Sequence, residues 1–240
     1  MQSGNPSDSR RFRALSRLPS KSEVTWFRRR LRFWFEHNRR DFPWRHSGDP
    51  YVICMSEIFL QQTGARKVAD LIGVFTAQYP DWNTLAKAAP AEIETIIYPL
   101  GIYRRRAKTI HSLANAVVRL DSLPHTRCGL ENLPGIGQYI ANVLLVVLQG
   151  RRIPFLDINM SRVLERFFGP RELADIRYDP YLQTLARKVV NVADSLSANW
   201  MILDFAALVC TKRRPRCSNC PLSERCLYGR KSVPRLSHSL

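Results

Sequence analysis

The sequence predicts an all-α protein. From about Glu23 onward, apolar residues recur every three or four positions, which is the spacing that gathers them on one face of a helix. Runs that alternate apolar and polar residues, as half-buried strands do, are not found, and no segment repeats at a fixed period. Proline and glycine separate the periodic runs. About ten short helices are therefore expected.

The expected helices follow one another with recognisable boundaries. Asp49 before Pro50 is typical of an N-cap followed by a first-turn proline, and Pro90 begins another helix. Breaks are expected at Pro43, residues 80–81, residues 100–101, Pro124 and residues 150–154. The periodic runs are residues 24–35, 49–63, 66–79, 91–100, 104–120, 142–150 and 160–168.

The chain is strongly basic, with 37 Lys and Arg against 20 Asp and Glu, a net charge of +17. Residues 1–45 contain twelve basic and four acidic residues, and residues 205–240 contain eight and one, so the two ends carry +8 and +7. Such an excess predicts a polyanionic partner, most simply nucleic acid. Residues 1–22, rich in Ser, Arg and Pro, are predicted to be a disordered basic tail, and residues 229–240 a second tail.

No secretory signal or membrane span is predicted. The N-terminal segment contains arginines but lacks the apolar core of a signal peptide. The apolar stretches at residues 143–148 and 200–210 are well short of the roughly 20 residues that a bilayer requires. We expect a soluble, cytoplasmic protein (nucleoid-associated in a prokaryote) that acts as a monomer and has no membrane partner.

Four of the six cysteines form a cluster with the spacing C-x6-C-x2-C-x5-C. In an intracellular chain, closely spaced cysteines favour a metal over disulfides. Four thiolates without a nearby histidine suit either tetrahedral zinc or an iron–sulfur cluster, and the wide first gap favours a [4Fe–4S] cluster. The predicted ligands are Cys210, Cys217, Cys220 and Cys226.

Other residues near these ligands carry weaker predictions. Cys54 and Cys128 are isolated in the sequence, so both are expected to be buried packing residues. The loop between the first two ligands is basic, and its cations are expected to contact phosphates or to offset thiolate charge. These cations are Lys212, Arg213, Arg214 and Arg216.

The segment LPGIGQYIANV, residues 133–143, predicts a tight turn that leads directly into a helix. Gly135 and Gly137 can adopt backbone conformations closed to other residues and allow another backbone to come close. The helix after the turn begins with free N–H groups, so the segment predicts an anion site, most simply for a DNA phosphate. A simple connection between two helices is the alternative interpretation.

Two carboxylates stand out from apolar surroundings. Asp157 precedes the helix expected at residues 160–168. It is either the N-cap of that helix or a carboxylate held near a reacting sugar, and one residue can have both roles. Glu57 lies within the apolar run 49–63, where burial would raise its pKa and suit it to proton transfer. An exposed glutamate on the polar face of that helix is the alternative.

Taken together, LPGIGQYIANV, LDINMSRVLERF and the four-cysteine loop resemble the helix–hairpin–helix DNA glycosylases of the endonuclease III superfamily, over about residues 23–228. The resemblance implies two helical lobes with a DNA-binding cleft between them. Residues 48–151 would form a six-helix barrel domain that ends in the helix–hairpin–helix. Residues 23–47 and 152–228 would form the [4Fe–4S] cluster domain. It also implies double-stranded DNA containing a mismatched or deaminated base as the partner.

The resemblance implies catalytic roles for three residues. Strand-cleaving members of the superfamily have a lysine two positions after the last glycine of the hairpin, and its amine forms a Schiff base with the sugar. Tyr139 occupies that position here, so little or no lyase activity is expected. Asp157 would stabilise the oxocarbenium-like sugar or activate water, and Glu57 would transfer a proton.

Further residues are implied to contact DNA or the extruded base. Gln61 and Gln62 would wedge into the duplex or read around that base. Trp44 and Arg45 are candidates for its pocket, although core packing is preferred for the tryptophan. Asp204 is a candidate for base recognition, with a buried cap or a salt-bridge partner as equal alternatives. The full predicted set is Gln61, Gln62, Gly135, Gly137, Gln138, Asn159, Trp44, Arg45 and Asp204.

Two branches of the superfamily compete for the target base. Thymine mismatch glycosylases, which remove thymine or uracil opposite guanine, are similar to this chain in PWRHSGDPYVI, DINMSRVLERFFG and LDFAALVC. Adenine glycosylases share LQQT, Glu57 and CPL, but they usually have DGN where this chain has DIN, and they extend further beyond the last cysteine. We therefore expect a monofunctional thymine/uracil mismatch glycosylase, with an adenine glycosylase or a non-catalytic DNA-binding protein as alternatives.

Overall fold

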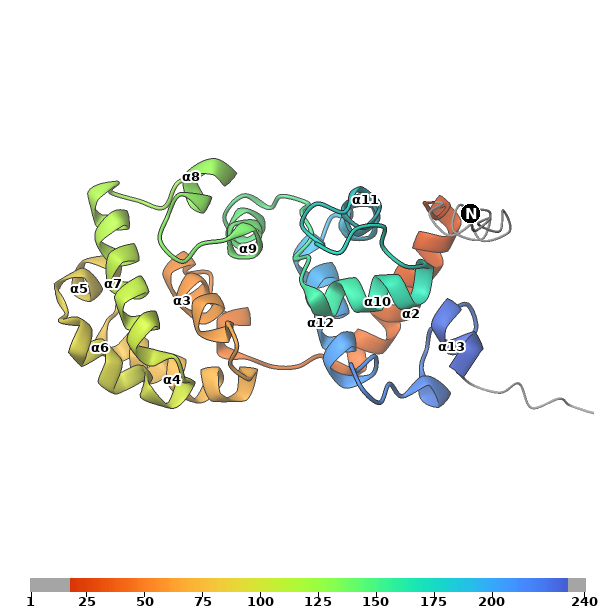
Figure 1. Ribbon diagram of the computed structural model, residues 1–240, viewed down its shortest axis with the longest axis horizontal. Helices are drawn as coiled ribbons and strands as arrows, with labels where there is room; N and C mark the ends of the chain where they lie inside the picture. The colour runs from red at the N-terminus through yellow and green to blue at the C-terminus, as the bar shows by residue number, and fades with distance from the viewer. Residues whose placement is uncertain (1–17, 233–240) are drawn as a thin grey trace, which may run out of the picture. The chain divides into compact units, whose positions relative to one another are not determined.

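The structure is a computed structural model, and it describes residues 18–232. Within these residues every regular element is a helix, with twelve α-helices and three short 3₁₀ helices (Figure 1). The all-α prediction is therefore confirmed. The chain forms two compact units, one comprising the residues up to Arg40 and from Arg152 onward, the other comprising Asp41–Arg151.

The unit Asp41–Arg151 is built around α3 (Pro50–Leu60), which is buried on nearly every side. Asp49 caps this helix by accepting a hydrogen bond from the Tyr51 N–H at 2.8 Å, with Pro50 in the first turn as predicted. The other helices of this unit are η1 (Pro43–Arg45), α4 (Ala65–Gln78), α5 (Trp82–Lys87), α6 (Pro90–Ile97), η2 (Tyr98–Leu100), α7 (Tyr103–Arg119), α8 (Arg127–Glu131) and α9 (Gln138–Gln149).

Packing in this unit follows the apolar stripes of the helices. α5 and α6 pack against α7, whose buried stripe contains Ile110, Leu113 and Val117. α3 packs against α4 and α9, and α8 packs against α9. The end of α3, the start of α7 and the start of α9 thereby belong to one packed body.

The other unit consists of α2 (Lys21–Asn38), α10 (Ile158–Phe168), α11 (Pro180–Val190), α12 (Ser195–Leu208), η3 (Cys217–Asn219) and α13 (Leu227–Ser232). α10 packs against α11, α12 and α13, and α2 packs against α11 and α12. An aromatic cluster closes its core, with the ring of Phe27 4.9 Å from that of Phe167 and 5.1 Å from that of Phe168.

Several predicted boundaries move in the structure. Residues 41–47 belong to the unit Asp41–Arg151, because η1 packs on α3 and α4 and buries Trp44. The helix α2 begins at Lys21 with Ser20 as its cap, so the predicted basic tail is two residues too long. Gly229 begins the predicted second tail but lies within α13. Residues 18–20 of the predicted first tail are described and lie directly before α2. The remainder of the two predicted tails, 1–17 and 233–240, falls outside the described residues.

The isolated cysteines behave differently from each other. Cys54 is buried in α3 as predicted, but Cys128 is exposed in α8, which makes its prediction wrong. α8 is a short helix that turns only part of its surface toward α9, and Leu130 is its buried residue. In the described part of the chain, no helix has both the length and the apolar character needed to cross a membrane.

Candidate active site and nucleic-acid interface

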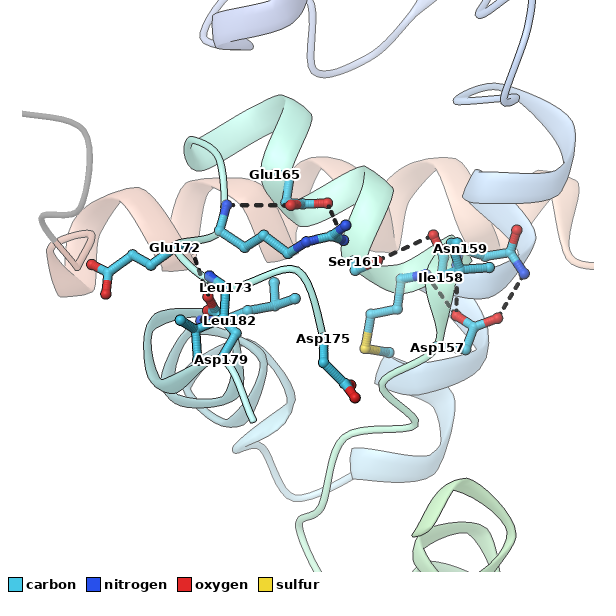
Figure 2. Close-up of polar contacts among 12 residues, drawn as sticks. Asp157, Ile158, Asn159, Ser161, Glu165, Glu172, Leu173, Asp175, Asp179 and Leu182 are labelled. Carbon is cyan, nitrogen blue, oxygen red and sulfur yellow. Dashed lines mark hydrogen bonds and ion pairs between the residues drawn. The ribbon is translucent and has the colours of Figure 1, made fainter. Parts of the chain in front are cut away.

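Asp157 is the N-cap of α10, and its carboxylate is held by three N–H groups (Figure 2). One oxygen, Oδ1, accepts hydrogen bonds from the backbone N–H of Asn159 at 2.9 Å and of Met160 at 2.7 Å. The other oxygen, Oδ2, accepts one from the Asn159 side-chain amide at 2.6 Å. The side chain is partly exposed, so the carboxylate is fixed in direction while remaining accessible.

Burial and nearby hydrogen-bond donors have opposite effects on the pKa of Asp157. Burial raises the pKa of Asp157 above its ordinary 3.8, while the hydrogen bonds from Met160 and Asn159 and the charge of Arg162 act to lower it. A carboxylate in such a poorly solvated place interacts more strongly with positive charge than one in water does. The arrangement therefore suits stabilisation of a cation that develops beside it.

Asp179, also shown in Figure 2, is a carboxylate of a different kind. It is fully buried, and its oxygens accept hydrogen bonds from the backbone N–H groups of Glu172, Leu173 and Leu182, each at 2.6 Å. These bonds cap α11 and hold the preceding loop. Because none of its surface is accessible, Asp179 serves the fold, which leaves Asp157 as the reactive candidate.

A chain of hydrogen bonds runs from Asp157 toward the cysteine loop. Arg162 donates from Nη1 to the Oδ1 atom of Asn159 at 3.1 Å, which orients the amide that holds Asp157. The same guanidinium donates from Nε to the carbonyl oxygen of Cys210 at 2.9 Å and from Nη2 to that of Ala206 at 3.0 Å. The carboxylate and the first predicted metal ligand are therefore tied to one arginine.

The four cysteines of the predicted metal site line one pocket, and no carboxylate lines it with them. Apolar side chains such as Val163 and Leu222 form most of its wall, and Arg166 and Arg216 supply positive charge. Within residues 18–232, no group of three or more His, Cys, Asp and Glu side chains is arranged to hold a metal ion. The shared pocket and the all-sulfur donor set nevertheless fit a sulfur-ligated group.

Arg166 is hydrogen-bonded to one of the thiols. It donates from Nη1 to the Sγ atom of Cys210 at 3.4 Å and to the Thr211 carbonyl at 2.7 Å, and its Nη2 reaches the Lys212 carbonyl at 3.0 Å. The guanidinium lies 4.5 Å from the ring centre of Tyr228. All four loop cations predicted from sequence are exposed, and Arg216 is the one among them that lines the pocket.

The two glycines of the hairpin differ in what they require. Gly135 has φ +79°, and a Cβ added there would come within 2.5 Å of the Cγ2 atom of Thr109 on α7. Gly137 has an extended φ of −96°, and a Cβ there would meet nothing within 4 Å. The predicted special conformation is therefore confirmed for Gly135 and wrong for Gly137. The approach of another backbone to either glycine stays a prediction, since the close neighbour of Gly135 is a side chain.

Gly137 is instead the N-cap of α9, and no side chain caps this helix. Gln138 and Tyr139 are its first two residues, and both side chains are partly exposed. The turn that follows α3 lies beside the hairpin, since the Gln61 side-chain amide donates to the Gly135 carbonyl at 3.5 Å. Gln62 in the same turn is exposed and has φ +58°.

Glu57 is 7% exposed within α3, so the alternative of an exposed polar-face glutamate is wrong. It lies near Cys54, whose thiol pKa is raised first by burial and second by the charge of Glu57. The raised pKa expected for Glu57 itself stays a prediction.

Three of the candidates for base contacts have structural contacts within the protein. Trp44 is buried and stacks on Phe42 with ring centres 4.7 Å apart, and Arg45 lies 5.4 Å from the same ring. Asp204 is fully buried and pairs with Arg40, accepting from its Nε at 2.7 Å and its backbone N–H at 2.8 Å. The salt-bridge alternative therefore holds for Asp204, and the base-recognition prediction is not supported.

Residues 55–177 match the model of the HhH-GPD superfamily of base excision DNA repair proteins. The chain belongs to this superfamily. The matched segment contains the hairpin, Glu57 and Asp157 and begins within α3.

Individual relatives within the superfamily are also similar to the chain. It is 36% identical to a thymine/uracil-DNA glycosylase of Pyrobaculum aerophilum, over 89% of this chain and 96% of that protein. It is 34% identical to an adenine DNA glycosylase of Mycolicibacterium smegmatis, over 79% of this chain and 65% of that protein. A solved structure of a thermostable thymine-DNA glycosylase matches with a TM-score of 0.82 and 30% identity, covering 88% of this chain and 98% of that one.

Three arginines of this HhH-GPD protein were missed by sequence reasoning. Arg162 and Arg166 are four residues apart, so they share one face of α10, the helix that Asp157 caps. Arg106 lies in the run of arginines at residues 104–106, where it alone is buried. The burial of Arg106 could have been predicted from its position, because it lies four residues before Ile110 and therefore on the apolar face of α7.

Proposed function

We propose that this protein is a monofunctional DNA glycosylase that hydrolyses the N-glycosidic bond of thymine or uracil opposite guanine in duplex DNA. The observation that carries the proposal is the partly exposed carboxylate of Asp157, fixed by three N–H groups at the start of α10, in a chain of the base excision repair superfamily. The protein would act as a monomer on duplexes with a mismatched or deaminated base.

In the proposed reaction the bond between the sugar and the base breaks, and positive charge develops on the sugar. Asp157 would stabilise that charge, or accept a proton from the water that attacks the sugar. Asn159 and Arg162 would keep the carboxylate in place, because their hydrogen bonds restrict its rotation. Thymine or uracil leaves as a stabilised anion, so the pocket needs only hydrogen bonds to it.

The absence of strand cleavage follows from Tyr139. A lyase needs an amine to form an imine with the opened sugar, and a phenol cannot form one. Tyr139 is the second residue of α9 and is partly exposed, so the position is accessible and carries the wrong group for that chemistry. The product would be an abasic site in an intact strand.

The preference for thymine or uracil is supported by the relatives and by residues near Asp157. The relative from Pyrobaculum aerophilum is matched over almost its whole length, and the thermostable thymine-DNA glycosylase is similar in structure. Ile158, which is 65% exposed directly after Asp157, stands where adenine enzymes usually have glycine. Adenine opposite guanine or 8-oxoguanine is the second candidate, favoured by the buried carboxylate of Glu57, which could protonate a departing purine.

Contacts to the DNA backbone and bases are proposed for the hairpin and the turn beside it. The first turn of α9 has no side-chain cap and Gly137 has no side chain to cover it, so its N–H groups are suited to a phosphate. Gln61 and Gln62 are exposed in the neighbouring turn and would contact the bases next to the extruded nucleotide. Lys212, Arg213 and Arg214 are exposed cations suited to flanking phosphates.

We also propose that Cys210, Cys217, Cys220 and Cys226 hold a [4Fe–4S] cluster. Their shared pocket, its apolar wall and the nearby Arg166 support this assignment, because the arginine offsets the negative charge of thiolate ligands. Bound there, the cluster would cross-link the segment between α12 and α13 to itself, because all four proposed ligands lie in that segment. Burial raises the pKa of the Cys220 thiol to about 12, so binding of the cluster would release protons.

The proposal is tested by single-turnover excision on duplexes with G·T, G·U, A·G, A·8-oxoG or thymine glycol, each with and without alkali. We expect release of thymine and uracil opposite guanine, with strand breaks only after alkali. Excision confined to adenine-containing mispairs would favour the second candidate. Covalent trapping of the wild type on abasic DNA by borohydride would contradict the monofunctional assignment.

Asp157→Asn tests the catalytic group, and Asp194→Asn is its matched control. Asp194 caps α12 by accepting from the Ser197 N–H at 2.9 Å, so the control makes the same chemical change at another helix start. We expect Asp157→Asn to lose roughly 100-fold or more in excision rate, comparable to the loss of one strong electrostatic contact, and Asp194→Asn to retain it. Base release by Asp157→Asn at the parent rate would favour a different mechanism, and none by the wild type would favour a DNA-binding protein without catalysis.

A further inference from the structure

Arg106 is a buried cation that has no acidic partner among residues 18–232. It is 3% exposed in the first turn of α7, and burial lowers the pKa of its guanidinium. Among the described residues it makes no ion pair. Its hydrogen bonds go instead to three backbone carbonyls and one hydroxyl. A buried charge without a counter-charge is expensive, so a residue of this kind needs a reason beyond filling space.

The partners of Arg106 belong to two separate turns. From Nη2 it donates to the Gln61 carbonyl at 2.5 Å and to the Thr63 hydroxyl at 3.2 Å, both in the turn after α3. From Nη1 it donates to the carbonyls of Gly101 at 2.9 Å and Leu100 at 3.3 Å, in the turn before α7. The Thr63 hydroxyl donates to the Leu100 carbonyl at 2.9 Å, which joins the turns directly.

Each of these turns contains a strained residue. Gln62 has φ +58° and Ile102 has φ +46°, and only one other non-glycine residue in the described chain has a positive φ. The Gln61 carbonyl belongs to the peptide group whose nitrogen is that of Gln62, and the Gly101 carbonyl bears the same relation to Ile102. Holding these two carbonyls therefore restricts the φ angle of both strained residues. One guanidinium thus holds the peptide group that precedes each of the two left-handed residues.

Both strained residues are exposed, and Ile102 is 51% exposed although it is apolar. Strained, exposed residues are typical of binding surfaces, where the conformation is kept because a partner needs it. The turn at Gln61 also contacts the hairpin through the Gly135 carbonyl. The turn after α3 is thus joined by hydrogen bonds both to the turn before α7 and to the hairpin.

We propose that Arg106 is a positioning residue for DNA binding, which holds Gln62 and Ile102 in left-handed conformations so that the two turns meet the duplex without rearranging. The inference deepens the proposed function and rests on it, since Gln62 is one of its proposed DNA contacts. Arg106 itself does not reach the phosphates, because its guanidinium is enclosed by the turns it holds. Its effect on DNA passes through Gln62 and Ile102.

The test uses full-length Arg106→Met and Arg106→Lys, with Arg119→Met as the control. Arg119 is an exposed arginine at the other end of α7, so the control removes the same charge from the same helix. Binding is measured on a duplex with a stable abasic-site analogue over a series of salt concentrations, and excision is measured on a G·U duplex at saturating enzyme. Urea unfolding of each variant reports the folded fraction.

We expect both Arg106 variants to bind the duplex roughly tenfold more weakly for each released turn, and up to about 100-fold more weakly overall. A lysine supplies one ammonium group, which cannot reach acceptors in both turns, so it should not restore binding. The slope of log affinity against log salt should stay at the wild-type value, because no phosphate contact is removed. Arg119→Met should bind as the wild type does.

Two results would overturn the inference. Folded Arg106→Met with wild-type affinity would show that the arginine serves the fold alone. A salt slope reduced by about 0.9 would show that Arg106 contacts a phosphate directly. If the wild type bound the duplex but released no base, the proposed function would fail, while the binding series would still decide the role of Arg106.

A second pair of variants covers the case in which Arg106→Met does not fold. Thr63→Val removes the hydroxyl that joins the two turns while conserving shape, and Thr63→Ser keeps that hydroxyl. We expect Thr63→Val to weaken duplex binding several-fold, with an unchanged salt slope, and Thr63→Ser to restore it. Equal, wild-type affinity of both variants would contradict the inference.

Discussion

Gly135→Ala tests the hairpin at the position where the backbone leaves no room for a side chain. The substitution adds one methyl group to a residue with φ +79°, in the left-handed region that other residues rarely adopt. The new Cβ would lie 2.5 Å from the Cγ2 atom of Thr109, far inside van der Waals contact. Either the hairpin or the Thr109 side chain must therefore move.

The cost has two parts that the structure separates. A Cβ in the left-handed region costs about 1–2 kcal/mol, and forcing the Thr109 side chain out of its rotamer costs about 0.5–1.5 kcal/mol. The loss of glycine flexibility in the unfolded chain returns about 0.4–1 kcal/mol. We therefore expect the free energy of unfolding to fall by about 0.5–3 kcal/mol. Because the hairpin presents the start of α9, DNA affinity should fall as well.

Urea unfolding and duplex binding measure the two effects, and two other variants serve as controls. Gly73→Ala is in the middle of α4 with nothing within 4 Å of the added atom, so it should stabilise by about 0.5–1 kcal/mol. Thr109→Ser removes the atom that clashes and keeps the hydroxyl that donates to the Arg105 carbonyl at 3.0 Å. In the double variant Gly135→Ala, Thr109→Ser the clash is gone and only the cost of the left-handed backbone remains.

Three results would contradict the predicted cost at Gly135. If Gly135→Ala unfolded at the wild-type urea concentration, the hairpin would not need its left-handed residue. If Thr109→Ser restored none of the lost stability in the double variant, the close approach to α7 would carry no cost. Equal losses at Gly135 and at Gly137, where the structure leaves open space, would also contradict it.

Three further predictions concern the other unit. Burial raises the pKa of Asp157 above 3.8, and only its charged form stabilises a cation. As the pH is lowered, the excision rate should therefore begin to fall at a higher pH than it would for an aspartate of ordinary pKa, which a pH–rate profile measures. Asp204→Asn should cost about 1–3 kcal/mol in urea unfolding, since it breaks the pair with the partly exposed Arg40, and should leave the base preference unchanged. Measured iron content should fall below the expected value of about four atoms per chain in Cys220→Ser. It should stay at that value in Cys128→Ser, because Cys128 is an exposed cysteine outside the predicted ligand set.

Much of the fold could be predicted from local pattern. The caps at Asp49 and Asp157 were recognisable because a short polar side chain before an apolar period can bond to the free N–H groups that begin a helix. The burial of Glu57 was predicted because it lies inside an apolar run, and that is a property of neighbours along one helix. Residues 41–47 were predicted to belong to the wrong unit. A 3₁₀ helix of three residues is too short to show an apolar periodicity, so its packing partner could not be predicted from the sequence.

Residue type and spacing along the chain were enough to predict the helical class, the superfamily motifs, the missing amine at Tyr139 and the four clustered thiols. The partners of the charged groups depend on the tertiary structure. In the structure Asp204 pairs with Arg40, and Arg162 links Asp157 to the cysteine loop through hydrogen bonds to Asn159 and Cys210. Arg106 donates to two turns that are far apart in the sequence. The physical reason is that burial and hydrogen-bond partners arise between segments far apart in sequence, where helical periodicity carries no information.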